Sequence, residues 1–239
     1  MEPVQAIFFD LDETLLDDNT SYFRSISLAS DELASAFPSF DFGRLFGAYR
    51  THSAACWVEM EEAVLQGSVD GQTVRLEGWR RALHDCGCDD AALAGIALEA
   101  YSRHRRETYA LFEDARDLLG RIEGRLPLAL ITNGSTDTQW EKARCTGLDT
   151  VLQAVVVSGE HGVAKPHPDI FKIALDRLGV APESAWHIGD SLSADVAGAK
   201  AAGLGAAVWL NRNGAVRTAA EPQPDLEIAS LAELLDHIA

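Results

Sequence analysis

The chain has 239 residues and a formal net charge of −17 at pH 7, with 47% hydrophobic and 24% charged residues. This length and balance are typical of a globular protein with a sizeable core and more than one domain. The acidic charge argues against nucleic acid and against an anionic membrane as partners, and no apolar run reaches the roughly 18 residues of a membrane span. An anionic substrate would need positive charge placed locally, from a metal, a lysine or helix N-termini.

The cysteines and the N-terminal residues indicate the compartment. The four cysteines include no Cys-x-x-Cys pair, and four in a chain of this length do not make a disulfide scaffold. Free thiols in a reducing environment are the favoured interpretation. Glu2 and the lack of a basic flank argue against a secretory signal. We therefore expect a cytoplasmic protein. These features do not indicate whether it is a monomer or an oligomer.

The first segment, residues 1–16, combines a strand with a pair of carboxylates. Ile7, Phe8 and Phe9 predict a strand buried on both faces. It ends in Asp10 and Asp12, whose side chains share one side of an extended chain. Two like charges held together require a cation, a shared proton or open solvent. Because open α/β sheets bind ligands at the carboxyl ends of strands, the pair is a candidate metal site. A solvated acidic turn explains this segment equally well when it is taken alone.

Residues 17–108 look helical throughout. Apolar and aromatic residues recur there at helical spacing, and no strand pattern interrupts them. Pro38 and the Gly67–Gly71 region indicate breaks between helices. We therefore predict an all-helical domain over residues 17–108, inserted between residues 1–16 and 109–239.

From Glu113 onward the pattern alternates between strand and helix. The predicted strands are Leu126–Ile131, Val151–Val157, Ala185–Ile188 and Ala206–Leu210, and the predicted helices are Thr136–Cys145, Pro168–Leu178 and Ala194–Ala202. Such alternation implies a parallel sheet with helices on both faces, to which the first strand also belongs. The expected fold is α/β, with a Rossmann-like parallel sheet core. The helical insertion would lie at the carboxyl edge of that sheet and act as a lid.

A second polar loop follows the strand that ends at Ile131. Thr132, Asn133 and Gly134 supply a hydroxyl, an amide and a glycine directly before a predicted helix. This composition suits the binding of phosphate oxygens by backbone N–H groups at a helix N-terminus. When the loop is taken alone, a plain helix cap by Ser135 or Thr136 is the favoured interpretation.

Two more loops carry a lysine and a pair of aspartates. Lys165 precedes Pro166, so its backbone is expected to be extended, and Pro168 is expected to open a helix. A lysine placed in this way presents its ammonium group as a point charge to a dianion. Asp190 directly follows a strand and suits a hard cation. Asp195 could cap the next helix, orient Lys165 or support the metal ligands.

In this order, the four loops resemble the four motifs of the haloacid dehalogenase-like hydrolase superfamily. The matching segments are Asp10-x-Asp12-x-Thr14-Leu15, Thr132-Asn133, Lys165-Pro166 and Gly189-Asp190-x-x-x-x-Asp195, which together span nearly the whole chain. The helical insertion resembles the small helical cap of this family. Three further segments resemble the branch that holds N-acylneuraminate-phosphate and pyrimidine-nucleotide phosphatases: Leu130–Gly134, Gly159–Phe171 and Ala207–Gly214.

The resemblance implies Mg²⁺-dependent hydrolysis of a small phosphorylated metabolite, such as a sugar phosphate or a nucleotide. Asp10 would attack phosphorus in line and form an aspartyl-phosphate. Asp12 would protonate the leaving alcohol and then activate water. The implied Mg²⁺ ligands are the Asp10 and Asp190 side chains and the Asp12 backbone carbonyl. The phosphate oxygens would be held by Thr132, the backbone near Asn133 and Lys165, with Asp195 in support.

Three other functions share this pattern in part. A 2-haloacid dehalogenase uses the same nucleophile but has no aspartate at the position of Asp12, so dehalogenation is disfavoured. A phosphosugar mutase would retain every site residue, and the sequence does not distinguish it from a phosphatase. A non-catalytic binding or regulatory module is disfavoured, because a retired site has no physical reason to keep clustered like charges. The residues of the insertion that would choose the substrate are not predicted.

Overall fold

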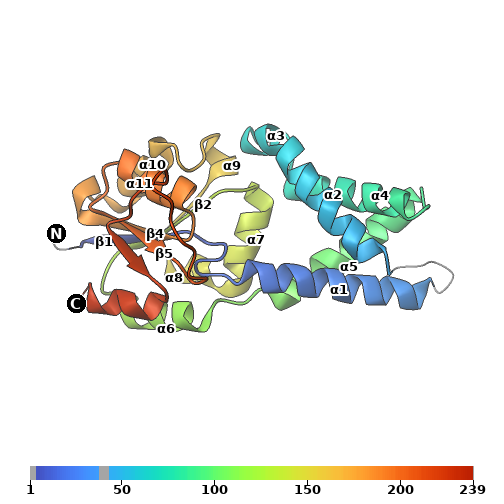
Figure 1. The fold of residues 1–239 in the computed structure, drawn as a ribbon, viewed down its shortest axis with the longest axis horizontal. Coiled ribbons are helices and arrows are strands. Elements are labelled where there is room, and N and C mark those ends of the chain that lie inside the picture. Colours follow the sequence, from blue (N-terminus) through green and yellow to red (C-terminus); the bar gives the residue numbers. More distant parts are fainter. Residues whose placement is uncertain (1–3, 38–42, 239) are drawn as a thin grey trace.

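The computed structural model describes residues 4–37 and 43–238. A six-stranded sheet flanked by helices forms one end of the molecule, and a group of helices forms the other (Figure 1). The predicted α/β fold, with a parallel sheet and helices on both faces, is confirmed. Within the described residues, no helix combines the length and the apolar character that a membrane crossing requires.

The strand order places β1 in the middle of the sheet. All pairings are parallel, in the order β3-β2-β1-β4-β5-β6. The strands are β1 Ala6–Phe9, β2 Leu128–Thr132, β3 Ala154–Val157, β4 Ala185–Gly189, β5 Ala206–Leu210 and β6 Leu226–Ile228. From β1 the chain builds outward on one side through β2 and β3, and then on the other side from β4. The carboxyl end of β1 is therefore the switch point at which open α/β sheets bind ligands.

Strand β1 shows why the sheet is covered on both faces. Its four side chains are fully buried, and they alternate between two hydrophobic clusters. Ile7 and Phe9 pack in one cluster, while Ala6 and Phe8 pack in the other, as the two-residue period of a strand requires. The first cluster includes residues of α6 (Glu113–Ile122), α7 (Thr136–Thr146) and α8 (Leu148–Val151), and the second includes residues of α10 (Pro168–Leu178) and α11 (Ala197–Ala201).

The structure corrects four details of the predicted elements. The strand predicted over Leu126–Ile131 is β2, which begins at Leu128 and ends at Thr132. The strand predicted over Val151–Val157 begins only at Ala154, because Val151 ends the short helix α8. The single helix predicted over Ala194–Ala202 is a π-helical turn, η2 (Leu192–Val196), that continues into α11. The edge strand β6 was not predicted. The helix Pro168–Leu178 and the strand Ala206–Leu210 have the predicted bounds.

The inserted stretch is helical, as predicted. Its helices are α1 Asp18–Ala36, α2 Leu45–Glu59, α3 Glu61–Leu65, α4 Gly71–Asp85 and α5 Ala91–Thr108. Four of them, α1, α2, α4 and α5, enclose a hydrophobic cluster in which Tyr49 stacks on Trp79 with ring centroids 3.8 Å apart. The predicted break at residues 67–71 falls between α3 and α4, and Pro38 lies outside the described residues. The division at residues 16/17 and 108/109 into a core and a separate cap domain stays a prediction.

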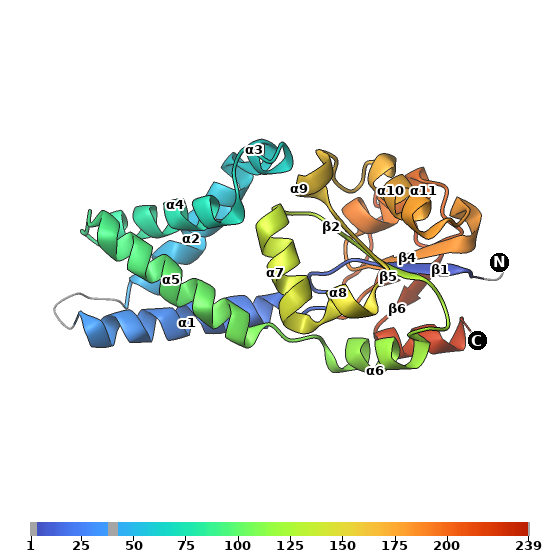
Figure 2. The ribbon, with the colours of Figure 1, turned by 180° about the vertical axis from the view of Figure 1, so that it is seen from behind.

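The inserted helices pack on elements that leave the carboxyl edge of the sheet. Figure 2 shows α3 beside α9 (Ser158–His161), and α5 close to α7. At the start of α4, the N–H groups of Gly71 and Gln72 donate to the carboxylate of Asp137 on α7, at 2.9 and 3.3 Å. A Cβ atom at Gly71 would lie 2.2 Å from Thr138 Oγ1, so only glycine allows this approach. The inserted helices therefore lie against the edge where the predicted site residues gather.

Candidate active site

The loop after β1 holds Asp10 at the sheet edge. The Asp10 N–H donates to the Ile188 carbonyl at 2.9 Å, so the pairing of β1 with β4 continues beyond the strand. The chain then turns tightly, and the N–H groups of Leu15 and Leu16 both donate to the Leu11 carbonyl at 3.0 and 2.9 Å. As a result Asp10 is buried, while the side chain of Asp12 remains one-third exposed.

Lys165 joins two of the predicted aspartates. Its buried Nζ atom donates to Asp10 Oδ1 at 2.5 Å and to Asp195 Oδ1 at 2.7 Å. The amide of Asn133 fixes the Lys165 backbone, because Nδ2 donates to the Lys165 carbonyl at 3.0 Å and Oδ1 accepts from its N–H at 2.9 Å. The loop after β2, which holds Asn133, therefore positions the loop that holds Lys165.

Three carboxylates from two loops form a compact group of oxygens. Among the described residues, Asp10, Asp190 and Asp195 each offer one oxygen within 4.8 Å of the others. Asp195 is held in place by its own chain, because its Oδ1 also accepts from His187 at 2.9 Å and its Oδ2 accepts from the Ser191 N–H at 3.0 Å. These contacts fix the Asp195 carboxylate within the oxygen cluster, and its role in supporting the metal ligands or Lys165 stays a prediction.

The electrostatics of this group fit a divalent cation. Burial raises the pKa of Asp10 to about 8 against the opposing effect of Lys165, and the carboxylates of Asp195 and Asp12 add to the rise. Burial also raises the pKa of Asp190 to about 6, with a further contribution from Asp195. With a pKa of about 8, Asp10 requires additional positive charge in order to be fully ionised at neutral pH, and the same charge would favour the ionised form of Asp190. Clustered carboxylate oxygens are the ligands that hard divalent cations such as Mg²⁺ prefer.

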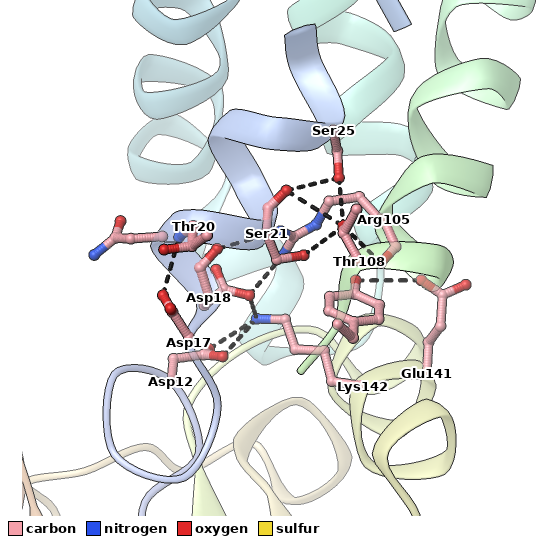
Figure 3. Close-up of polar contacts among 12 residues, drawn as sticks. Asp12, Asp17, Asp18, Thr20, Ser21, Ser25, Arg105, Thr108, Glu141 and Lys142 are labelled. Carbon is pink, nitrogen blue, oxygen red and sulfur yellow. Dashed lines mark hydrogen bonds and ion pairs between the residues drawn. The ribbon is translucent and has the colours of Figure 1, made fainter. Parts of the chain in front are cut away.

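Asp12 lies outside that group and has different partners. Lys142 Nζ donates to both of its carboxylate oxygens, at 2.7 and 2.9 Å, and Gln139 Nε2 donates to Oδ2 at 3.1 Å. The same lysine lies 3.0 Å from Asp18 Oδ1 at the start of α1, so it links the loop after β1 to the first of the inserted helices (Figure 3). Sequence analysis missed both partners. The only available signal was their i, i+3 spacing, which places Gln139 and Lys142 on one face of α7.

The loop after β2 is more than a helix cap. Thr132 is buried at the end of the strand, and its Oγ1 accepts from Gln139 Nε2 at 2.6 Å. Ser135 occupies the N-cap position of α7, but its buried hydroxyl has no hydrogen-bond partner. The expectation that Ser135 simply caps the helix is therefore wrong. The Ser135 hydroxyl lies close to Gly71 at the start of α4.

A cavity of about 220 Å³ opens between this loop and the inserted helices. Asp12, Ser135 and Lys142 line it on one side, and three charged residues of the inserted helices line it on the other: Asp18, Arg75 and Arg105. The structure thus brings every predicted site residue to one edge of the sheet. It adds to them a set of charged side chains that sequence analysis did not assign.

Comparison with known proteins agrees with this arrangement. Residues 4–203 match the haloacid dehalogenase-like hydrolase family. The N-acylneuraminate-9-phosphatase of Rattus norvegicus is 30% identical over 235 residues, which cover 97% of this chain and 92% of the relative. The phosphoserine phosphatase of Thermus thermophilus is 33% identical over 251 residues, covering 97% and 98%. A HAD-hydrolase of Bacillus subtilis, crystallised with bound magnesium, is 26% identical with a TM-score of 0.73 and covers 99% of both chains. The predicted resemblance is confirmed, and the chain belongs to the haloacid dehalogenase-like hydrolase family.

Proposed function

We propose that this phosphoric monoester hydrolase cleaves a small phosphorylated metabolite through an aspartyl-phosphate on Asp10, with Mg²⁺ as its cation. The observation that carries the proposal is the environment of Asp10. Lys165 holds one oxygen of its carboxylate, Asp190 shares its oxygen cluster, and Asp12 follows two residues later. Nucleophile, positive charge and a second carboxyl group are the parts that phosphoryl transfer requires.

The first half of the reaction uses the Asp10 and Asp12 carboxyl groups in turn. Because Lys165 holds Oδ1, Asp10 is oriented for in-line attack by its other oxygen on phosphorus. A bond from Asp10 to phosphorus forms while the bond from phosphorus to the leaving oxygen breaks. Asp12 gives its proton to that leaving oxygen, so that an alcohol departs rather than an alkoxide. In the structure Lys142 donates to both Asp12 oxygens and Gln139 to one of them, an arrangement that suits the ionised carboxylate, so Asp12 gives up one of the Lys142 contacts when it enters this step protonated.

The second half returns the enzyme to its starting state. Asp12, now a carboxylate, takes a proton from water as the water oxygen attacks phosphorus. The bond between phosphorus and Asp10 breaks, and phosphate leaves. Thr132, the backbone near Asn133 and Lys165 would hold the phosphate oxygens during both steps.

The Asp10 and Asp190 side chains and the Asp12 backbone carbonyl would hold the cation, with Asp195 in support. The cation supplies positive charge that offsets the clustered carboxylates and the charge of the phosphate. The phosphatase names of the two relatives and the magnesium bound by the Bacillus subtilis hydrolase support this assignment. We also propose that residues 17–108 act as a cap over a core formed by residues 1–16 and 109–239.

The test is phosphate release from a panel of phosphate monoesters, with Mg²⁺ and with a chelator. Wild type should release phosphate only with the divalent cation, and Asp10→Asn should lose the activity. Asp176→Asn is the matched control, because Asp176 is exposed on α10, away from the site. Full activity in Asp10→Asn would refute the mechanism. A product that keeps its phosphate at a new position, instead of free phosphate, would identify a mutase.

A further inference from the structure

The cavity beside Asp12 is lined by a buried arginine, Arg75, and one nitrogen of its guanidinium group has no hydrogen-bond partner. Arg75 of α4 is 3% exposed, and its Nη1 atom is buried and makes no hydrogen bond. Its ion-pair partner Glu141 lies 4.0 Å away, beyond hydrogen-bond reach. Glu141 is also shared with Arg106 at 3.3 Å and with the Tyr109 hydroxyl at 3.4 Å. A buried, incompletely paired guanidinium is costly unless a ligand completes its bonding.

The other cations that line the cavity are already paired. Lys142 bonds to Asp12 and Asp18, and Arg105 bonds to Asp18 Oδ1 at 2.5 Å. Figure 3 shows these contacts meeting at Asp18. Among the lining residues themselves, three cations face two carboxylates, and Arg75 is the most weakly paired cation, because Glu141 lies outside the lining, 4.0 Å away, and is shared with Arg106. One more negative charge within the cavity would match the cations of its lining.

Further polar atoms of the lining residues also lack partners. The hydroxyl groups of Ser135 and Thr138 and the Nε atom of Arg105 are buried without hydrogen bonds. Buried polar atoms normally find a partner; the two hydroxyls lie against Gly71 at the start of α4, so these two unpaired atoms belong to the contact of α7 with α4 that borders the cavity. The volume, about 220 Å³, is below the usual range of ligand pockets. The ligand portion in this cavity is therefore small.

We infer that the leaving alcohol of the substrate carries a carboxylate, which Arg75 binds within this cavity. The inference rests on the proposed function, since Asp12, the residue assigned to protonate the leaving alcohol, lines the same cavity. A carboxylate supplies the single negative charge that the lining needs. Its two oxygens also match the fork of N–H donors on a guanidinium. The opposing interpretation is that Arg75 only packs beside Tyr101, whose ring centroid lies 5.8 Å from the guanidinium carbon.

The experiment compares kcat/KM for pairs of esters that differ in the carboxylate. One pair is O-phosphoserine and O-phosphoethanolamine, and the other is 3-phosphoglycerate and glycerol 3-phosphate. Wild type should prefer the carboxylated member of at least one pair by about tenfold or more, the ratio expected for a charge-assisted bond. Arg75→Met should bring that ratio close to one, mainly through a higher KM for the carboxylated ester. Arg75→Lys should keep part of the preference, because it keeps the charge but loses the fork.

The matched control is Arg80→Met, on the same helix with a side chain that is 61% exposed. It should keep the wild-type ratio. The inference would be overturned if the wild-type kcat/KM ratio were near one in both pairs, or if Arg75→Met left that ratio unchanged. The first of these results does not depend on the folding of any variant. A stronger preference for fructose 1,6-bisphosphate than for the carboxylated esters would also overturn it. Cleavage of p-nitrophenyl phosphate distinguishes a failure of this inference from a failure of the proposed function. Hydrolysis of this ester without a carboxylate preference refutes only the inference. No hydrolysis of any ester refutes the proposed function too.

Discussion

Replacing Lys142 with methionine should destabilise the protein strongly, because this lysine lies between two carboxylates. Lys142 is 5% exposed and bonds to Asp12 and Asp18 at 2.7 to 3.0 Å. Removing one partner of a buried ion pair costs about 3–5 kcal/mol. We expect the lower end, about 3 kcal/mol, because one-third of the Asp12 side chain is exposed and Asp18 keeps its bond to Arg105. For a chain of this size the melting temperature should fall by roughly 6–12 °C.

The assay is thermal unfolding of wild type, Lys142→Met and the control Lys172→Met. Lys172 pairs with Asp169 on the surface, and its side chain is 61% exposed, so its loss should cost no more than about 1 kcal/mol. The reasoning would be refuted if the two variants lost the same stability.

The pH dependence of the stability difference between wild type and Lys142→Met provides a second check. Burial raises the pKa of Asp18, but Lys142 and Arg105 lower it by more, to about 2 from 3.8. An acid whose pKa is lower in the folded state stabilises the fold only while it is ionised. This contribution is therefore complete above about pH 4 and fades as the pH falls toward 2. The gap between wild type and Lys142→Met should narrow over the same interval, and a constant gap would show that the charge pair is not its cause.

Two further predictions concern the catalytic chemistry. Asp12→Asn should lower kcat for alkyl phosphates by about 10²–10⁴. With p-nitrophenyl phosphate, Asp12→Asn should give a burst of nitrophenolate followed by slow turnover. This leaving group needs no proton, whereas the attack of water on the intermediate still needs a base. Stopped-flow absorbance without a burst would contradict the double role of Asp12. Gly189→Ala should raise the Mg²⁺ concentration needed for half-maximal activity by about 10–100-fold. The reason is that the new Cβ would lie 2.2 Å from Asp195 Cγ and displace this carboxylate. The control Gly120→Ala, which meets no atom within 4 Å on α6, should leave the Mg²⁺ titration unchanged.

The sequence predicted the centre of the sheet and the loops that follow its strands. Strands such as β1 and β5 are buried on both faces, so each reads as a continuous apolar run that stops where polar chemistry begins. Asp10 and Asp190 follow such runs directly, and parallel strands bring their carboxyl ends to one edge. The pattern of residues along the chain is therefore enough to group these aspartates at a single site.

The remaining errors arise where local pattern is ambiguous or absent. An apolar run does not distinguish a helical turn from a strand, so Val151 was assigned to β3 although it ends α8. Strand β6 has only three residues, Leu-Glu-Ile, which is too short a run for its apolar-polar-apolar alternation to identify a strand, and it occupies the sheet edge. The bond between Lys142 and Asp12 joins positions 130 residues apart. Only the packing of the inserted helices and α7 against the sheet brings such pairs together.

The distribution of buried charge explains how so acidic a chain can bind an anion. Among the described residues, the only buried lysines and arginines are Arg75, Arg105, Lys142 and Lys165, and all four border the site. The excess negative charge lies mainly on exposed side chains, where salt at physiological strength screens it beyond about 8 Å. Interactions of the buried cations are screened much less, because solvent does not surround them. An anionic substrate therefore meets weak repulsion at the surface, and within the site the buried cations, together with the proposed Mg²⁺, offset the carboxylates around them, which favours ligands small enough to enter the cavity.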